Sequence, residues 1–240
     1  MRVEIWSDVV CPWCYLGKRR LEEALAGFEH RDEVEVVYRS FELDPAAPAH
    51  GHGDREPTLV ALTRKYGRSE SQMRAMMQQL IATAAEEGLA FRLLETVHTS
   101  TRDAHRLLHL AREVGGPALQ YRLKEALFAA YFTRAQDVAD PAVLAAVAAE
   151  VGLDADRVAQ VLAGQEYAAQ VQADIDAAHE LGVGGVPFTV VDGRYGISGA
   201  QPAEAIGQVL ERAWSERPAV TVVAAGGAGG DACGPDGCPI

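Results

Sequence analysis

Basic residues and cysteines are scarce in this chain of 240 residues. Lysine and arginine together number 22 against 34 aspartate and glutamate residues, which leaves a formal net charge of −12. Binding to nucleic acid or to an anionic membrane requires a basic surface, so we expect neither partner. With only four cysteines, a small secreted scaffold held together by disulfides is also excluded.

Long apolar runs are missing as well. No stretch approaches the roughly 20 apolar residues of a membrane-spanning helix. Glu4 and Asp8 interrupt the N-terminal segment, where a secretory signal would carry a cationic start and an unbroken apolar run. We therefore predict a cytoplasmic protein. Apolar residues still make up 48% of the chain, which is enough for a packed core.

The four cysteines form two close pairs far apart in the sequence. Cys11 and Cys14 form a Cys-x-x-Cys motif, and Cys233 and Cys238 are separated by four residues near the C-terminus. Close pairs in a chain predicted to be cytoplasmic indicate redox chemistry or metal ligation. The wide separation favours redox chemistry over a zinc ribbon, whose pairs lie close together in sequence. We predict no metal site.

Local patterns predict β structure at both ends and helices between them. A short strand at 3–7, a helix after the Cys-x-x-Cys motif and an alternating strand at 34–41 form a βαβ unit with parallel strands. From 57 to 181 apolar residues recur at helical intervals, which predicts about six helices and no strand. Asp140, before Pro141, and Asp154 are suited to cap two of these helices.

A β-hairpin is predicted near the C-terminal end. Strands at 186–191 and 194–198 flank a two-residue turn, Asp192-Gly193, and a last helix follows at 203–214. The fold class is therefore α/β, with one four-stranded sheet interrupted by a large all-helical insert. We place the first half of the sheet domain at 1–45, the insert at 57–181, the second half at 182–216 and a flexible glycine-rich tail at 217–240.

A cysteine at the start of a helix has a clear chemical use. A thiolate attacks disulfides, and the free N–H groups and dipole of a helix N-terminus favour the anion. We therefore expect Cys11, before the helix, to be an exposed nucleophile with a lowered pKa. Cys14, one turn deeper, would be the shielded resolving thiol. Pro12 and Trp13, between the cysteines, would contact the substrate.

Three further features are candidates for the substrate site. A cis proline at Pro187 beside the cysteines would present the Val186 backbone to an extended substrate. His105 has three possible roles: ordinary packing, a place in the cleft or, with His109 on the same helix face, metal binding. The methionines of the first helical stretch are expected in a helix core, with a peptide-binding groove as the alternative; they are Met73, Met76 and Met77.

Four segments together resemble the FrnE branch of the DsbA-like family over residues 1–214. They are Asp8–Gly17, Ala104–Leu107, Gly182–Phe188 and Ile197–Pro202. The resemblance implies a thioredoxin fold with an inserted helical domain and thiol–disulfide oxidoreductase activity. It also implies Cys11 as nucleophile, Cys14 as its partner and Pro187 as the cis proline.

Two other functions remain open. A related branch contains glutathione-dependent isomerases of hydroxychromene carboxylates, which commonly have serine at the position of Cys11, so retention of both cysteines favours redox chemistry. A metal-binding stress protein with four thiolates is the other possibility. Cys233 and Cys238 are an auxiliary redox pair, an inert tail or a metal clip. We expect no required cofactor, glutathione as a possible reductant, protein or small-molecule thiols and disulfides as substrates, and a monomer or homodimer.

Overall fold

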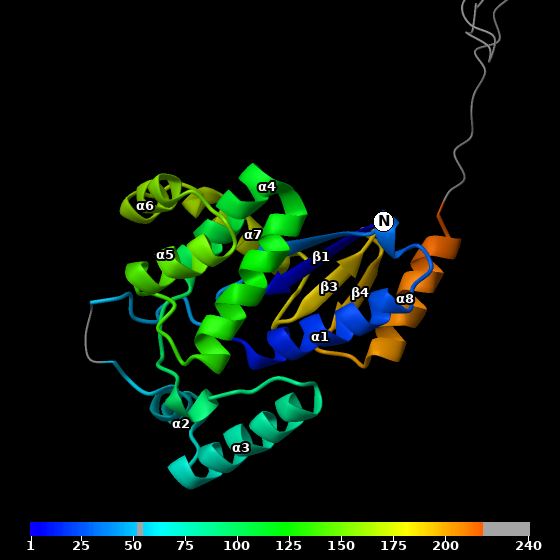
Figure 1. The fold of residues 1–240 in the computed structure, drawn as a ribbon. Helices are drawn as coiled ribbons and strands as arrows, with labels where there is room; N and C mark the ends of the chain where they lie inside the picture. Colours follow the sequence, from blue (N-terminus) through cyan, green and yellow to red (C-terminus); the bar gives the residue numbers. More distant parts are fainter. Residues whose placement is uncertain (52–54, 218–240) are drawn as a thin grey trace, which may run out of the picture.

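A four-stranded sheet lies at the centre of the computed structural model, which describes residues 1–51 and 55–217 (Figure 1). The strand order is β2-β1-β3-β4. β1 (Arg2–Ser7) is parallel to β2 (Glu35–Ser40) and antiparallel to β3 (Phe188–Val191), and β3 pairs antiparallel with β4 (Tyr195–Ser198). The two halves of the chain thus complete one sheet, and the predicted thioredoxin fold is confirmed.

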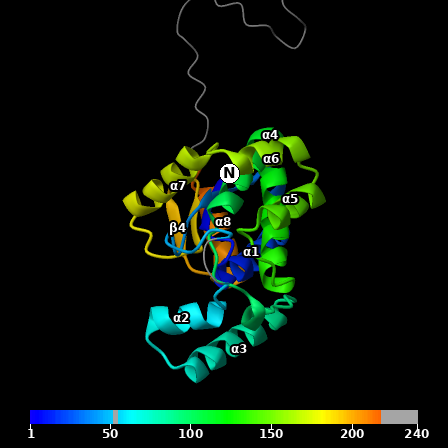
Figure 2. The ribbon, with the colours of Figure 1, turned by 90° about the vertical axis from the view of Figure 1, so that its left-hand side faces the viewer.

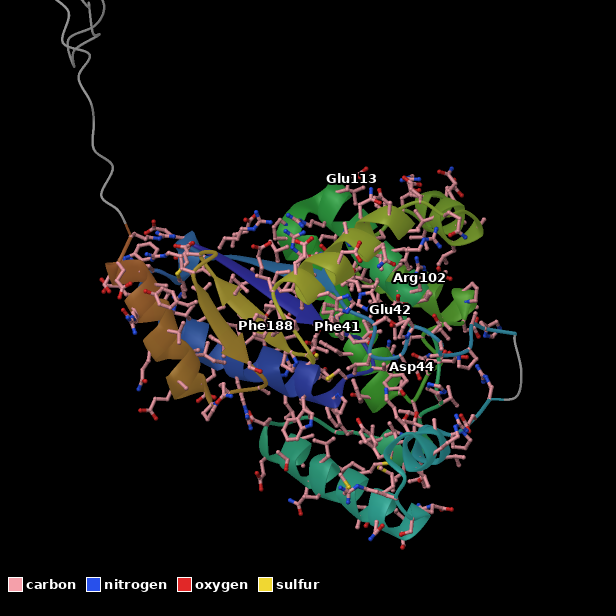
Figure 3. The ribbon with its side chains drawn as sticks, turned by 180° about the vertical axis from the view of Figure 1, so that it is seen from behind. Phe41, Glu42, Asp44, Arg102, Glu113 and Phe188 are labelled. Atoms are coloured by element: carbon pink, nitrogen blue, oxygen red, sulfur yellow. The ribbon has the colours of Figure 1, made fainter. Side chains whose placement is uncertain are left out.

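Both faces of the sheet are covered. Val3 and Ile5 alternate onto the face that packs against α1 (Pro12–Ala26) and α8 (Ala203–Ser215), whose apolar residues complete that core. On the opposite face, Trp6 packs with Phe41 and Phe188, which Figure 3 shows close together. The Trp6 indole N–H donates to the Asp174 carbonyl at 2.8 Å, on α7 (Ala168–Glu180). β1 therefore alternates in side-chain direction but is buried on both faces at its end.

Six α-helices lie between β2 and β3 in the described part of the chain, as predicted. Besides α7 they are α2 (Thr58–Tyr66), α3 (Glu70–Glu86), α4 (Arg102–Phe128), α5 (Pro141–Glu150) and α6 (Ala155–Ala163). Short 3-10 turns occupy Arg31–Glu33 and Leu93–Glu95, and a π turn occupies Ala129–Thr133. Asp140 accepts a hydrogen bond from the Ala142 N–H and Asp154 from the Arg157 N–H, so both predicted caps are present.

Helix α4 ties the insert to the free edge of the sheet. Its axis changes direction at Gly116, where φ is 66°, and Pro117 starts the second segment. The buried Gln120 side chain then accepts from the Tyr38 N–H at 2.9 Å and donates to the Tyr38 carbonyl at 3.0 Å. This amide satisfies edge backbone groups of β2 that have no neighbouring strand. The hydrogen bonds set the position of α4 against the sheet.

The hairpin differs from the prediction by one residue. Strand pairing begins at Val191 opposite Tyr195, so the loop has three residues rather than two. Asp192 and Gly193 both have positive φ, 49° and 65°, and Arg194 donates its N–H to the Val191 carbonyl at 3.0 Å. The predicted dipeptide makes the turn, but Arg194 stays outside the strand pairing.

The insert packs directly on the start of α1. The largest apolar core joins Cys11, Cys14 and Tyr15 to residues of α3 and α4, and the Tyr15 ring stacks on Phe128 with centroids 4.7 Å apart. Helices α2 and α3 lie across from the N-terminal end of α1 (Figure 2). Among the described residues, no helix is both long and apolar enough to cross a bilayer.

Candidate active site

Cys11 and Cys14 are placed by the first turn of α1. Cys11 is the N-cap with extended backbone, and Pro12 follows as the first helical residue, where its missing N–H has no intrahelical partner to lose. The Cys14 N–H donates to the Cys11 carbonyl at 3.0 Å, which closes the turn. Both thiols are free. The motif therefore holds two sulfurs one helical turn apart, as the spacing predicts.

The expected exposure of Cys11 is wrong. Its side chain is 4% exposed and that of Cys14 is 2% exposed. Val186 covers one side of Cys11, and residues of the helical insert continue the same apolar core. Trp13, in contrast, is 46% exposed. The insert, whose packing local patterns do not reveal, buries the sulfur that the isolated motif would expose.

The loop before β3 meets the cysteines as predicted. The Val186–Pro187 peptide bond is cis, and the Cys11 thiol donates to the Val186 carbonyl at 3.4 Å. Gly17 on α1 makes this approach possible, because a Cβ atom there would lie 3.2 Å from the Pro187 ring. The Val186 backbone therefore lies beside the sulfur that would carry a bound substrate.

Each thiol affects the ionisation of the other. The hydrogen bond with Cys14, together with burial, raises the pKa of the Cys11 thiol well above its usual value, and the Asp8 carboxylate adds to this rise. Burial also acts to raise the pKa of Cys14, but the hydrogen bond from Cys11 and the charge of Lys124 bring it below its usual value. The expected lowering of the pKa is therefore found at Cys14 and not at Cys11.

Lys124 is a buried charge behind this pair. Its side chain is fully buried on α4, one turn beyond Gln120, and its Nζ donates to the Ser7 carbonyl at 3.3 Å. Burial lowers the pKa of Lys124 to about 8, while the charges of Cys14, Asp8 and Cys11 partly oppose this. Sequence reasoning missed this residue. The available signal was a pair of polar residues, at 120 and 124, on an otherwise apolar helix face.

Asp8 and His105 form a second buried pair. His105 is fully buried, and its Nε2 lies 3.3 Å from Asp8 Oδ1. The other Asp8 oxygen accepts the Leu43 N–H at 2.8 Å. Burial acts to raise the pKa of Asp8, but His105 and the Leu43 N–H bring it below its usual value. His105 does not line the cavity described below, so its predicted direct contact with substrate is corrected to a contact with Asp8.

The part of the chain that the structure describes gives no support to the metal-binding alternative for His105 and His109. His109 Nε2 lies 3.1 Å from an Asp174 carboxylate oxygen and 3.2 Å from the Ser40 hydroxyl. Within residues 1–51 and 55–217, no group of three or more His, Cys, Asp or Glu side chains is arranged to hold a metal ion. Cys233 and Cys238 lie outside the described residues, so their role stays a prediction.

A cavity of about 960 Å³ opens onto Cys11. Asp8, Pro12, Trp13 and Val186 line it on the side of the sheet domain, and α2 and α3 form the opposite wall. Met73 and Met77 are buried in the core and also line this wall, while Met76 is half exposed. The predicted helix core is therefore confirmed for Met73 and Met77, and the alternative of a peptide-binding groove stays a prediction.

A family model, a solved structure and a further relative are similar to this chain in sequence over most of its length. The model of the DsbA-like thioredoxin domain matches residues 2–211. A probable DsbA oxidoreductase from Streptomyces coelicolor, SCO1869, is 50% identical, with a TM-score of 0.86 over 100% of this chain and 99% of that one. The uncharacterized protein YwbO of Bacillus subtilis is 29% identical, covering 80% of this chain and 86% of its own.

A more distant structure shares the fold alone. It is a 2-hydroxychromene-2-carboxylate isomerase, 16% identical, with a TM-score of 0.64 over 88% of this chain and 95% of that one. The Cys-x-x-Cys motif at the start of α1, the neighbouring cis proline and the family match over nearly the whole described chain lead to one assignment. The chain belongs to the DsbA-like thioredoxin-domain family.

Proposed function

We propose that this protein is a thiol–disulfide oxidoreductase of the FrnE type that acts through Cys11 and Cys14. The observation that carries the proposal is the pair of free thiols one helical turn apart at the start of α1, with Val186 and the cis Pro187 beside them. Glutathione is a plausible reductant and no other cofactor is required. The cytoplasm and a monomer or homodimer stay our predictions for the protein.

The geometry suggests an order of steps. Cys11 passes its proton to the Cys14 thiolate and attacks one sulfur of a substrate disulfide, which releases the other sulfur as a thiolate. Cys14 then gives its proton to the released thiolate and attacks Cys11 Sγ, which breaks the mixed disulfide and releases the second substrate sulfur as a thiolate. The positive charge of Lys124 stabilises the Cys14 thiolate during this resolving step.

A trapping experiment tests the assignment of the two cysteines. Cys14→Ser removes the resolving thiol but leaves the attacking one, so a mixed disulfide with substrate should accumulate and be visible by intact-protein mass spectrometry. Cys11→Ser should form much less adduct, because Cys14 is buried behind it. Equal adducts on both variants, or insulin disulfides and small disulfides untouched by the wild-type protein, would contradict the proposal.

A glutathione-dependent isomerase is the second candidate, supported by the shared fold and by the cavity beside Cys11. The two functions differ in their need for Cys14. Isomerisation of a small aromatic substrate that requires glutathione and survives Cys14→Ser would favour the isomerase. Loss of all turnover in the same variant would favour the redox enzyme.

A further inference from the structure

We infer that the substrate of this site is a small, neutral, apolar disulfide or its thiol, rather than glutathione disulfide or a disulfide of a folded protein. The inference rests on the proposed function and adds the chemical class on which it acts. Three properties of the cavity carry it: the burial of Cys11, the apolar side chains on the wall of the insert, and the pairing of the charges around it.

Burial restricts what can reach the sulfur. Cys11 lines the cavity but is only 4% exposed, whereas Trp13, the next lining residue but one, is 46% exposed. A disulfide on the surface of a folded protein would meet Trp13 before Cys11. A molecule narrow enough to enter the cavity can bring its sulfur to Cys11.

The wall opposite Cys11 combines a group of adaptable apolar side chains with the polar residues Arg64, Lys65, Gln79 and Thr83. Ala61 and Leu62 of α2 and Met73, Met77 and Leu80 of α3 line it. Methionine side chains adjust their shape and make favourable contacts with aromatic rings. The volume of about 960 Å³ falls at the upper end of the range typical of small-molecule sites. The walls therefore suit an aryl or alkyl body attached to the reacting sulfur.

The charged residues at the cavity are mostly engaged with one another. Arg64 bonds both carboxylate oxygens of Glu56, at 2.5 and 2.9 Å, and His98 Nε2 lies 3.0 Å from Asp44. Lys65 bonds a backbone carbonyl, and it is the lining cation without a carboxylate partner among the described residues. Glutathione disulfide carries four carboxylates, of which Lys65 can pair with one, and burying another without a partner is costly. A neutral molecule avoids that cost.

The reaction balances without a further reagent. The reduced enzyme supplies two electrons and two protons from its thiols. The substrate disulfide becomes two thiols, and Cys11 and Cys14 become joined by a disulfide. A single turnover of reduced enzyme with excess disulfide therefore measures substrate choice directly.

The test compares three probes with the reduced full-length protein in a stopped-flow experiment. Dithiodipyridine is a neutral aromatic disulfide, dithiobis(nitrobenzoate) is a similar aromatic disulfide with two carboxylates, and glutathione disulfide is polar and charged. Each rate is divided by the rate of the same probe with dithiothreitol, which removes differences in intrinsic reactivity. We expect the normalised rate with dithiodipyridine to exceed both others by about tenfold or more.

Two variants locate the effect in the cavity. Ala61→Phe fills the space beside the methionine wall and should slow dithiodipyridine by about tenfold or more, whereas Val60→Phe, at an exposed neighbour outside the lining, should not. Met76→Lys adds a cation at a half-exposed lining position where folding is little affected. It should raise the rate with the dicarboxylate probe relative to the neutral one.

The possible outcomes test the substrate class separately from the oxidoreductase activity. If the reduced protein reacts with all three probes at equal normalised rates, or if Ala61→Phe and Met76→Lys leave their ratio unchanged, the substrate class is wrong and the oxidoreductase stands. If it reacts with none, while both thiols are shown to be reduced, the proposed function itself fails. A preference for glutathione disulfide would also overturn the inferred class.

Discussion

Replacing the buried Lys124 with methionine should stabilise the protein at neutral pH. The folded structure lowers the pKa of this amine from 10.5 to about 8, and the difference corresponds to about 3 kcal/mol spent in keeping the amine charged in the folded state. Methionine has a similar length and no charge to bury. We therefore expect Lys124→Met to raise the free energy of unfolding by about 2–3 kcal/mol at pH 7.

The pH dependence gives a second signature of the same cost. Between pH 8 and 10.5 the unfolded chain keeps a proton on Lys124 that the folded chain has lost, so wild-type stability rises with pH in this window. Below pH 8 both states are protonated and the full cost is present. The advantage of Lys124→Met should therefore be largest near pH 7 and shrink steadily toward pH 10.

Urea unfolding followed by circular dichroism measures both effects. The disulfide form should be used, because the thiols then do not titrate. Thiolates raise the pKa of Lys124, so their absence leaves a cost at least as large. Lys18→Met is the matched control: Lys18 is also buried but lies 2.5 Å from Glu22 and 2.8 Å from Glu125. Its loss should destabilise the protein by about 1–2 kcal/mol.

The two lysines thus predict opposite signs for the same substitution. A Lys124→Met protein that is less stable than wild type at pH 7, with unchanged structure by near-ultraviolet circular dichroism, would refute the reasoning. A stability gain that stays constant up to pH 10 would show that packing, rather than the buried charge, is responsible.

Three further predictions concern the chemistry of the cysteines. Lys124→Met removes a charge that stabilises the Cys14 thiolate, and an interaction of about 1–2 kcal/mol corresponds to about 20–40 mV. The reduction potential measured in glutathione redox buffers should therefore fall by that amount. An unchanged or higher potential would exclude this role of Lys124. The added methyl group of Gly17→Ala should press on Pro187 and slow disulfide reduction several-fold. Gly27→Ala is the control, because its Cβ atom would meet its nearest neighbour at an ordinary 3.8 Å, and it should not slow the reaction. Equal rates for the two variants would mean that the loop containing Pro187 moves aside without cost. Asp8→Asn removes a carboxylate that raises the pKa of the Cys11 thiol, so its alkylation by iodoacetamide should begin at lower pH than in wild type, and a shift to higher pH would contradict the assignment.

The elements of this fold could be predicted because their signals are local. Alternating residues mark β1 and β2, helical spacing marks the insert, and the Cys-x-x-Cys motif followed by a helical pattern places two sulfurs at a helix start. The proline after Val186 and the Asp192-Gly193 turn are likewise short-range features. Such patterns depend on φ/ψ preferences and side-chain periodicity, which neighbouring residues determine.

The environment of the sulfurs depends on contacts across more than a hundred residues. The charge of Lys124 lowers the pKa of Cys14 because Gln120 fixes α4 against the edge of β2, and residues of α2 and α3 line the cavity next to Cys11. Sequence alone therefore placed the two cysteines at the start of a helix and the proline after Val186 at the start of the hairpin. Only the packing of the insert on α1 decided that Cys11 is buried, that the pKa of Cys14 rather than that of Cys11 is lowered, and which residues line the cavity, because burial and charge at a site are sums over distant segments.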